Sequence, residues 1–218
     1  MTSYNLSTYR DKLRILLILY FFSENYFDNE HSNRIKVFQS EVKIQKIDFL
    51  IRYPDYLSYE LIEKAKTDSS VNRDEIKNII KEIFLTKEPE VRREEMLKFL
   101  YGAWEEIDDI ILFLKALNLI NFECKKNIAG RPYDKTYYIT TEGKNIIENR
   151  IIPNLKAAQW YINRCLLIKR FFGDMRGTEL KISQYKHQEY RETSLGSYIS
   201  AITDKVKEYY FNEFGEAL

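Results

Sequence analysis

The 218-residue sequence has few of the residues that interrupt regular structure, with only 7 glycines and 4 prolines. Turns and loops depend on these two residue types, so their scarcity predicts a mostly helical chain. Only 2 cysteines and 2 histidines are present, and they form no cluster with metal-ligand spacing. A glycine-rich phosphate loop and a nucleophile-elbow serine are also missing. We therefore expect no metal, no cofactor, no catalytic residues and no enzymatic activity.

Long apolar runs and an excess of one charge are also missing. The longest apolar run, Ile15 to Phe22, is far shorter than the ~20 residues that a membrane-spanning helix needs, so no membrane contact is expected. No secretory leader opens the chain, which predicts a cytoplasmic protein with reduced thiols at Cys124 and Cys165. The formal net charge is +1, whereas free-standing nucleic-acid binders usually carry a basic excess. Any nucleic-acid contact would therefore come from a local basic patch.

Apolar residues, in contrast, make up 44% of the chain, which is enough for a folded core. Their three-and-four spacing predicts helices along most of the sequence. The helix over Tyr9–Ser23 is apolar nearly all round, so we expect it in the core, with burial against a partner as the alternative. Glu24 to Arg34 is polar, which predicts a surface loop. The other helices predicted outside the central segment cover Ser40–Tyr53, Asp55–Lys66, Asn72–Phe84, Pro153–Phe172, Glu179–Tyr190 and 195–214.

The stretch from Glu105 to Arg150 carries the clearest pattern. Helical spacing predicts a helix over Glu105–Asn118, and alternating apolar residues predict a strand over Leu119–Cys124. A basic loop, Lys125–Lys135, leads into the aromatic and β-branched strand Thr136–Thr140, after which a second helix opens. Helix, hairpin and helix in this order resemble the second half of a winged-helix domain, with the basic loop as the wing.

These patterns predict a mainly α fold, in which a winged-helix core of helices and a small antiparallel β-hairpin has helical additions at both ends. Leu97–Tyr101 is expected to supply a short strand that pairs with the wing. The predicted regions are an N-terminal helical region over 1–66, a winged-helix domain over 72–150 and a C-terminal helical region over 153–218. A winged helix alone does not define a function, because the fold binds DNA, binds protein or only dimerises.

The first turn of the predicted recognition helix is acidic. Four of its five residues, Glu105 to Asp109, are carboxylates. A helix in a DNA groove offers basic or amide side chains to base edges, and phosphate would repel these acids at about 1 kcal/mol for each close pair in water. Acidic residues also favour the N-terminus of any helix. Whether these acids act against phosphate or only stabilise the helix N-terminus, they disfavour sequence-specific DNA binding through this helix.

Two basic groups are candidate sites. The first lies in the wing, where the alternative to contact with a DNA backbone is a solvated hairpin tip. Its members are Lys125, Lys126, Arg131 and Lys135. The second group alternates with aromatic residues, a combination that can bind a nucleic-acid backbone or a protein partner. It could also form a solvated helix face. We favour a protein partner or a solvated face over DNA. Its members are Arg164, Lys169, Arg170, Arg176, Lys181 and Lys186. Both histidines, His31 and His187, are expected at the surface.

Four phrases, in this order and spacing, resemble the small middle subunit of bacterial three-component ABC-ATPase systems, called LmuC in the Lamassu anti-phage systems. The phrases cover Ile44–Pro54, Glu95–Trp104, Tyr137–Lys144 and Phe172–Lys181. The resemblance implies a non-catalytic accessory subunit that bridges an SMC- or Rad50-like ATPase and an effector such as a nuclease, with a non-specific contact to DNA.

Such subunits are similar to paired winged-helix proteins, which would make the N-terminal region a degenerate first winged half. The alternative function is a winged-helix DNA-binding transcription regulator. A hydrolase is the third possibility, and it would require metal-dependent activity from the isolated chain.

Overall fold

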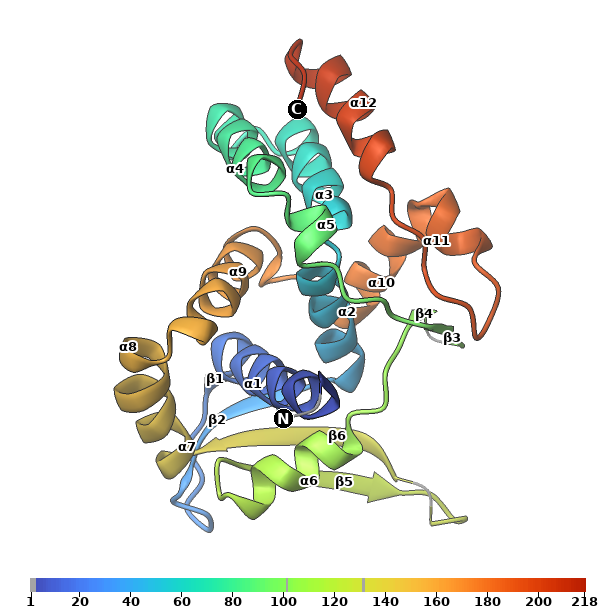
Figure 1. Ribbon diagram of the computed structural model, residues 1–218. Helices are drawn as coiled ribbons and strands as arrows, with labels where there is room; N and C mark the ends of the chain where they lie inside the picture. The colour runs from blue at the N-terminus through green and yellow to red at the C-terminus, as the bar shows by residue number, and fades with distance from the viewer. Residues whose placement is uncertain (1–2, 101, 131) are drawn as a thin grey trace. The chain divides into compact units, whose positions relative to one another are not determined.

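The computed structural model describes residues 3–100, 102–130 and 132–218 (Figure 1). The fold is mainly α, as the sequence predicted, with a four-stranded antiparallel sheet and a separate two-stranded one among the described residues. Two compact units are present. Unit 1 combines Met1–Asp48 with Glu106–Gly177, and unit 2 combines Phe49–Glu105 with Thr178–Leu218. These units differ from the three consecutive regions that the sequence suggested, because each is assembled from two separate stretches of the chain.

The four-stranded sheet of unit 1 contains the predicted hairpin. Its strands are β1 (Glu24–Asn25), β2 (Arg34–Gln39), β6 (Pro132–Thr140) and β5 (Ile120–Lys126), in that order. The hairpin strands pair antiparallel, with Ile120 opposite Ile139 and Phe122 opposite Tyr137. On the other side of β6, Val37 pairs with Tyr138. The segment Glu24–Arg34, predicted as a loop, therefore contributes a short edge strand and the first residue of the next strand.

The strand expected at Leu97–Tyr101 does not pair with the wing, so this part of the prediction was wrong. Within the described residues of this stretch, Lys98–Phe99 forms β3 and pairs with β4 (Gly102–Ala103) in the two-stranded sheet of unit 2; Tyr101 lies outside the described residues. Gly102 has φ of +92°, a conformation that glycine adopts readily, so the chain can turn back at once on itself. The strand beside the wing is β2 instead.

Helix α1 (Ser3–Phe22) forms the centre of unit 1, as Figure 1 shows. It packs against α6 (Asp108–Ala116), α9 (Lys156–Phe172), β2 and β6. Residues Ile15 to Leu19 are buried on every side, which explains why the helix is apolar nearly all round. The prediction that it lies in the core is confirmed. The buried Arg14 guanidinium is neutralised by Asp48, with Nε 2.5 Å from Oδ1.

The phrase Tyr-Ile-Thr-Thr-Glu-Gly-Lys joins the hairpin to the next helix. The Thr140 hydroxyl caps α7 (Thr141–Ile146) by accepting a hydrogen bond from the Gly143 N–H at 2.9 Å. The same hydroxyl donates to the Asn118 carbonyl oxygen at 2.5 Å and also to the Leu119 carbonyl oxygen at 3.1 Å. Gly143 lies so close to that oxygen that a Cβ would be 2.0 Å from it. Threonine and glycine thus fix the angle at which α7 leaves β6. A π-helical turn, Ile147–Ile151, and α8 (Ile152–Asn154) follow.

Unit 2 is helical around an aromatic core. Its helices are α3 (Pro54–Thr67), α4 (Arg73–Leu85), α5 (Glu88–Val91), α10 (Gly177–Lys186), α11 (Gln188–Glu192) and α12 (Thr203–Phe214), and α2 (Glu41–Arg52) runs from unit 1 into this unit. Helix α3 packs against α4, α5 and α12. Asn72 caps α4 as predicted, accepting from the N–H groups of Asp74 and Glu75.

Tyr53, near the end of the phrase Ile44–Pro54, and the adjacent Asp55 have a structural role in unit 2. The hydroxyl of the buried Tyr53 donates to the Ile199 carbonyl oxygen at 3.0 Å. The buried Asp55 carboxylate, just beyond Pro54, accepts from the Ile202 N–H at 2.6 Å. These bonds hold the segment that leads into α12. None of the helices in the described chain combines the length and hydropathy needed to cross a bilayer.

Candidate functional site

The wing contains one internal ion pair and one partly buried lysine. Lys125 forms an exposed ion pair with Asp134 at 2.6 Å, while Lys126 is exposed. Lys135 is only 14% exposed and lies 2.6 Å from Asp108 and 2.9 Å from Glu41. Burial alone would lower the pKa of Lys135, but the bonds to both carboxylates raise it. Lys135 therefore ties β6 to the starts of α6 and α2, and this engagement argues against the predicted phosphate contact. Arg131 lies outside the described residues.

The outer face of α6 is apolar and acidic. The helix runs from Asp108 to Ala116, shorter than predicted, and buries Ile111 and Leu114. Its exposed residues are Asp109, Leu112, Lys115 and Ala116, with Leu117 just beyond the last turn. The Lys115 ammonium lies over the Phe122 ring, 4.9 Å from its centre. Leu112 is 55% exposed and Leu117 is 51% exposed. Large apolar side chains beside carboxylates suit a protein surface better than a polyanionic groove. We define the outer α6 face as Asp109, Leu112, Ala116 and Leu117.

The second basic group is divided between the two units, and one of its members is buried. Arg164 is buried, and its guanidinium lies 5.2 Å from the centre of the Trp160 ring, so its assignment to an exposed surface was wrong. Because it faces inward from α9, its charge is directed toward the interior of unit 1. Lys169, Arg170 and Arg176 are exposed in unit 1. The remaining two members, Lys181 and Lys186, belong to α10 in unit 2.

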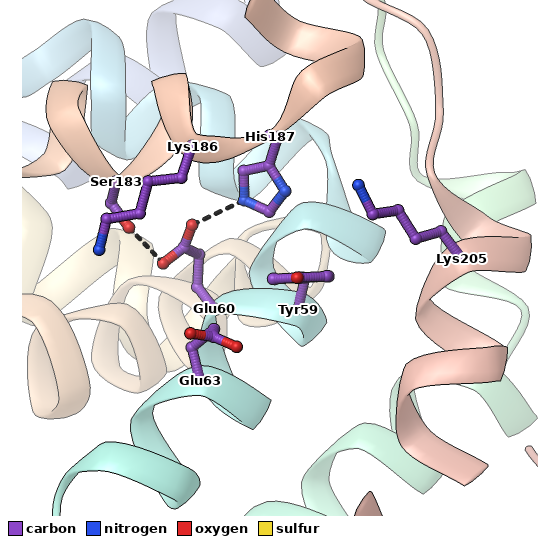
Figure 2. A pocket seen from close by; sticks show the side chains of 7 residues that line it. All are labelled: Tyr59, Glu60, Glu63, Ser183, Lys186, His187 and Lys205. Atoms are coloured by element: carbon purple, nitrogen blue, oxygen red, sulfur yellow. Dashed lines mark hydrogen bonds and ion pairs between the residues drawn. The ribbon is translucent and has the colours of Figure 1, made fainter. Parts of the chain in front are cut away.

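Unit 2 contains a polar pocket of about 90 Å³, drawn in Figure 2. It is lined by Tyr59, Glu60, Glu63, Ser183, Lys186, His187 and Lys205. Glu60, on α3, accepts a hydrogen bond from the Ser183 hydroxyl at 2.5 Å, and its other oxygen lies 2.8 Å from His187 Nε2. His187 is 3% exposed, so the prediction that it lies at the surface was wrong.

Side chains in this pocket are arranged for internal bonding. Ser183 and His187 both meet the Glu60 carboxylate rather than each other, whereas a serine nucleophile needs its hydroxyl on the histidine ring. The Lys205 ammonium is 2.9 Å from a Glu189 oxygen, and the Tyr209 hydroxyl donates to Glu63. The pocket therefore joins α3, α10 and α12 through satisfied polar groups.

Sequence reasoning could not find this cluster, because Glu60 and His187 are 127 positions apart. His187 also packs against the Tyr59 ring, with centroids 4.5 Å apart, and neither contact follows a helical spacing. Both cysteines are free, with Cys165 buried. Among the described residues, no group of three or more histidine, cysteine or acidic side chains is arranged to hold a metal ion.

Comparisons of the chain with family models, curated proteins and solved structures returned no match in any of the three.

Proposed function

We propose that unit 1 is a winged-helix domain that binds protein, and that the chain is a non-catalytic accessory subunit of an anti-phage defence complex. In this proposal it bridges an SMC- or Rad50-like ATPase and an effector, such as a nuclease, in the manner of the Lamassu middle subunit that its sequence resembles. The order of elements in unit 1 supports the winged-helix assignment. Within unit 1, helix α1, strand β2, the start of α2, helix α6 and the hairpin β5–β6 occur in the order of that fold, with the unit 2 residues 49–105 between α2 and α6.

The outer α6 face carries the proposal. In a DNA-binding winged helix this helix would enter the major groove, where basic and amide side chains are needed. Here the corresponding surface has two half-exposed leucines and an exposed aspartate. The nearby basic residue, Lys115, extends over the Phe122 ring, 4.9 Å from its centre. Burying Leu112 and Leu117 against a partner would provide the apolar centre that protein interfaces require.

Co-purification tests this proposal directly. The tagged chain is expressed with the products of its neighbouring genes, and an ATPase with a coiled-coil region is expected in the eluate. Leu112→Asp should weaken capture by about 30-fold or more, because loss of a central apolar anchor costs about 2 kcal/mol. Leu166→Asp is the matched control, since Leu166 is a 48% exposed leucine of the same unit on another helix. A chain that elutes alone, or an equal loss in both variants, would contradict the proposal.

A DNA-binding transcription regulator is the second candidate, and the exposed wing favours it. Lys126 is exposed, and the fully exposed Ile128 lies in the same loop. A regulator should protect a defined operator from cleavage, and Lys126→Glu or Arg131→Glu should abolish that footprint. The accessory subunit should instead show weak binding without sequence preference, which falls steeply as salt rises.

A further inference from the structure

Two lysines on different elements of unit 1 lie near Tyr20. Lys36, on β2, places its ammonium 5.0 Å from the centre of the Tyr20 ring and donates to the Tyr20 carbonyl oxygen at 3.5 Å. The Tyr20 hydroxyl donates to Glu148 at 2.6 Å. The same Glu148 oxygen is 3.9 Å from the ammonium of Lys144, on α7. Lys36 and Lys144 are therefore linked through Tyr20 and Glu148.

Lys169 adds a third positive charge from α9, which packs along α1. Burial lowers the pKa of Lys36, and the charges of Lys169 and Lys144 lower it further, while Glu148 opposes them. The charge of Lys36 thus interacts with the charges of Lys144 and Lys169, and the Glu148 carboxylate opposes their effect. Glu148 also accepts a hydrogen bond from the Tyr20 hydroxyl, so the lysines are not its only partners. The fold maintains an excess of positive charge here although the whole chain carries only +1.

We propose that this lysine cluster, Lys36, Lys144 and Lys169, binds the phosphodiester backbone of a nucleic acid without reading its sequence. Lysine ammonium groups contact phosphate as point charges and need no fixed geometry. Protein interfaces, in contrast, are depleted of lysine, which makes a polyanion the better match than a protein surface. The cluster uses none of the wing residues and none of the outer α6 face. This inference rests on the proposed function, which expects weak DNA binding without sequence preference, and it names the residues that make that contact.

Fluorescence anisotropy with the full chain tests the proposal. The probes are labelled DNA and RNA duplexes of about 20 base pairs and one sequence, titrated from about 50 to 200 mM salt. The variant K36Q/K144Q/K169Q should lose at least 10-fold in affinity for DNA at low salt. Its slope of log affinity against log salt should fall by about 2 to 3, since each phosphate contact contributes about 0.9. A similar loss with the RNA duplex identifies the shared backbone as the ligand, and a loss with DNA alone restricts the proposal to DNA.

The matched control is K66Q/K87Q/K207Q, which removes the same charge from three exposed lysines of unit 2. It should change affinity by less than about 3-fold, because none of these three lysines belongs to the cluster. The charge-retaining K36R/K144R/K169R should bind as the wild type does. Should Lys36→Gln impair folding, the double variant K144Q/K169Q changes only side chains at the surface and should still lower the slope.

Equal losses of affinity in K36Q/K144Q/K169Q and in the control K66Q/K87Q/K207Q would overturn the proposal. Wild-type affinity in K36Q/K144Q/K169Q would also overturn it. A wild-type chain that fails to bind either duplex at low salt would overturn it as well. The variant K36Q/K144Q/K169Q should capture the ATPase as well as the wild type does, which separates this test from that of the proposed function.

Discussion

Replacing Gly143 with alanine should destabilise the protein, although glycine-to-alanine changes within helices usually stabilise. Gly143 lies in the first turn of α7, where alanine is favoured by up to about 1 kcal/mol. However, an added Cβ would lie 2.0 Å from the Leu119 carbonyl oxygen. This oxygen belongs to the backbone and cannot rotate away as a side chain does. It also accepts hydrogen bonds from the N–H and the hydroxyl of Thr140, so shifting it would disturb the cap of α7.

The magnitude follows from two opposing effects. Overpacking of a buried site costs about 1 to 3 kcal/mol, and the rigid backbone places this site near the upper value. Subtracting the helix preference of about 1 kcal/mol leaves a loss of about 2 kcal/mol in the free energy of unfolding. Urea denaturation followed by circular dichroism measures it, with Glu142→Ala as the control at the exposed neighbouring position. A Gly143→Ala protein as stable as the wild type would refute the reasoning.

Three further predictions concern internal contacts. Lys135→Met should lower the free energy of unfolding by about 1 to 2 kcal/mol in a urea melt, since Asp108 and Glu41 lose their shared cation; unchanged stability would contradict the assigned role. Burial raises the pKa of Asp55 above 3.8, so the folded state binds a proton at this carboxyl more tightly than the unfolded state does. The wild type should therefore lose stability relative to Asp55→Asn as the pH rises from 3.8 through the pKa of Asp55 in the folded state. A pH-independent difference would exclude this linkage. His187→Ala should destabilise by about 2 kcal/mol, because it empties a buried ring site and removes a Glu60 partner, whereas His31→Ala should have little effect on the same melt.

Local patterns predicted most of the helices and the β5–β6 hairpin. The all-round apolar character of α1 indicated its burial, and the Asn72 cap indicated where α4 begins. Both signals depend only on neighbouring residues, so a single sequence contains them in full.

Pairings between distant segments could not be predicted in the same way. Strand β2 has only one fully buried residue, Phe38, and carries Arg34 and Lys36 among half-buried neighbours, so its alternation is weak. Its partner β6 is remote in the sequence. For the same reason the lysine cluster was missed, since Lys36 and Lys144 meet only through Tyr20 and Glu148.

Candidate site residues were harder to predict than helices, because charge alone does not show which way a side chain points. Lys135 and Arg164 were grouped with exposed basic residues, yet one links two carboxylates and the other is buried beside Trp160. The acidic start of the predicted recognition helix was visible in the sequence. Its apolar outward residues, Leu112 and Leu117, became evident only once the buried side of the helix was known.

The most direct measurement is amide hydrogen exchange of α6, recorded for the free chain, with the co-expressed ATPase and with duplex DNA. Buried interfaces slow the exchange of the amides they cover. Residues 109–117 are expected to exchange more slowly in the ATPase complex and at the free-chain rate with DNA. Slowing of these amides by DNA, or no change in the presence of the ATPase, would contradict a protein-binding role for the outer α6 face.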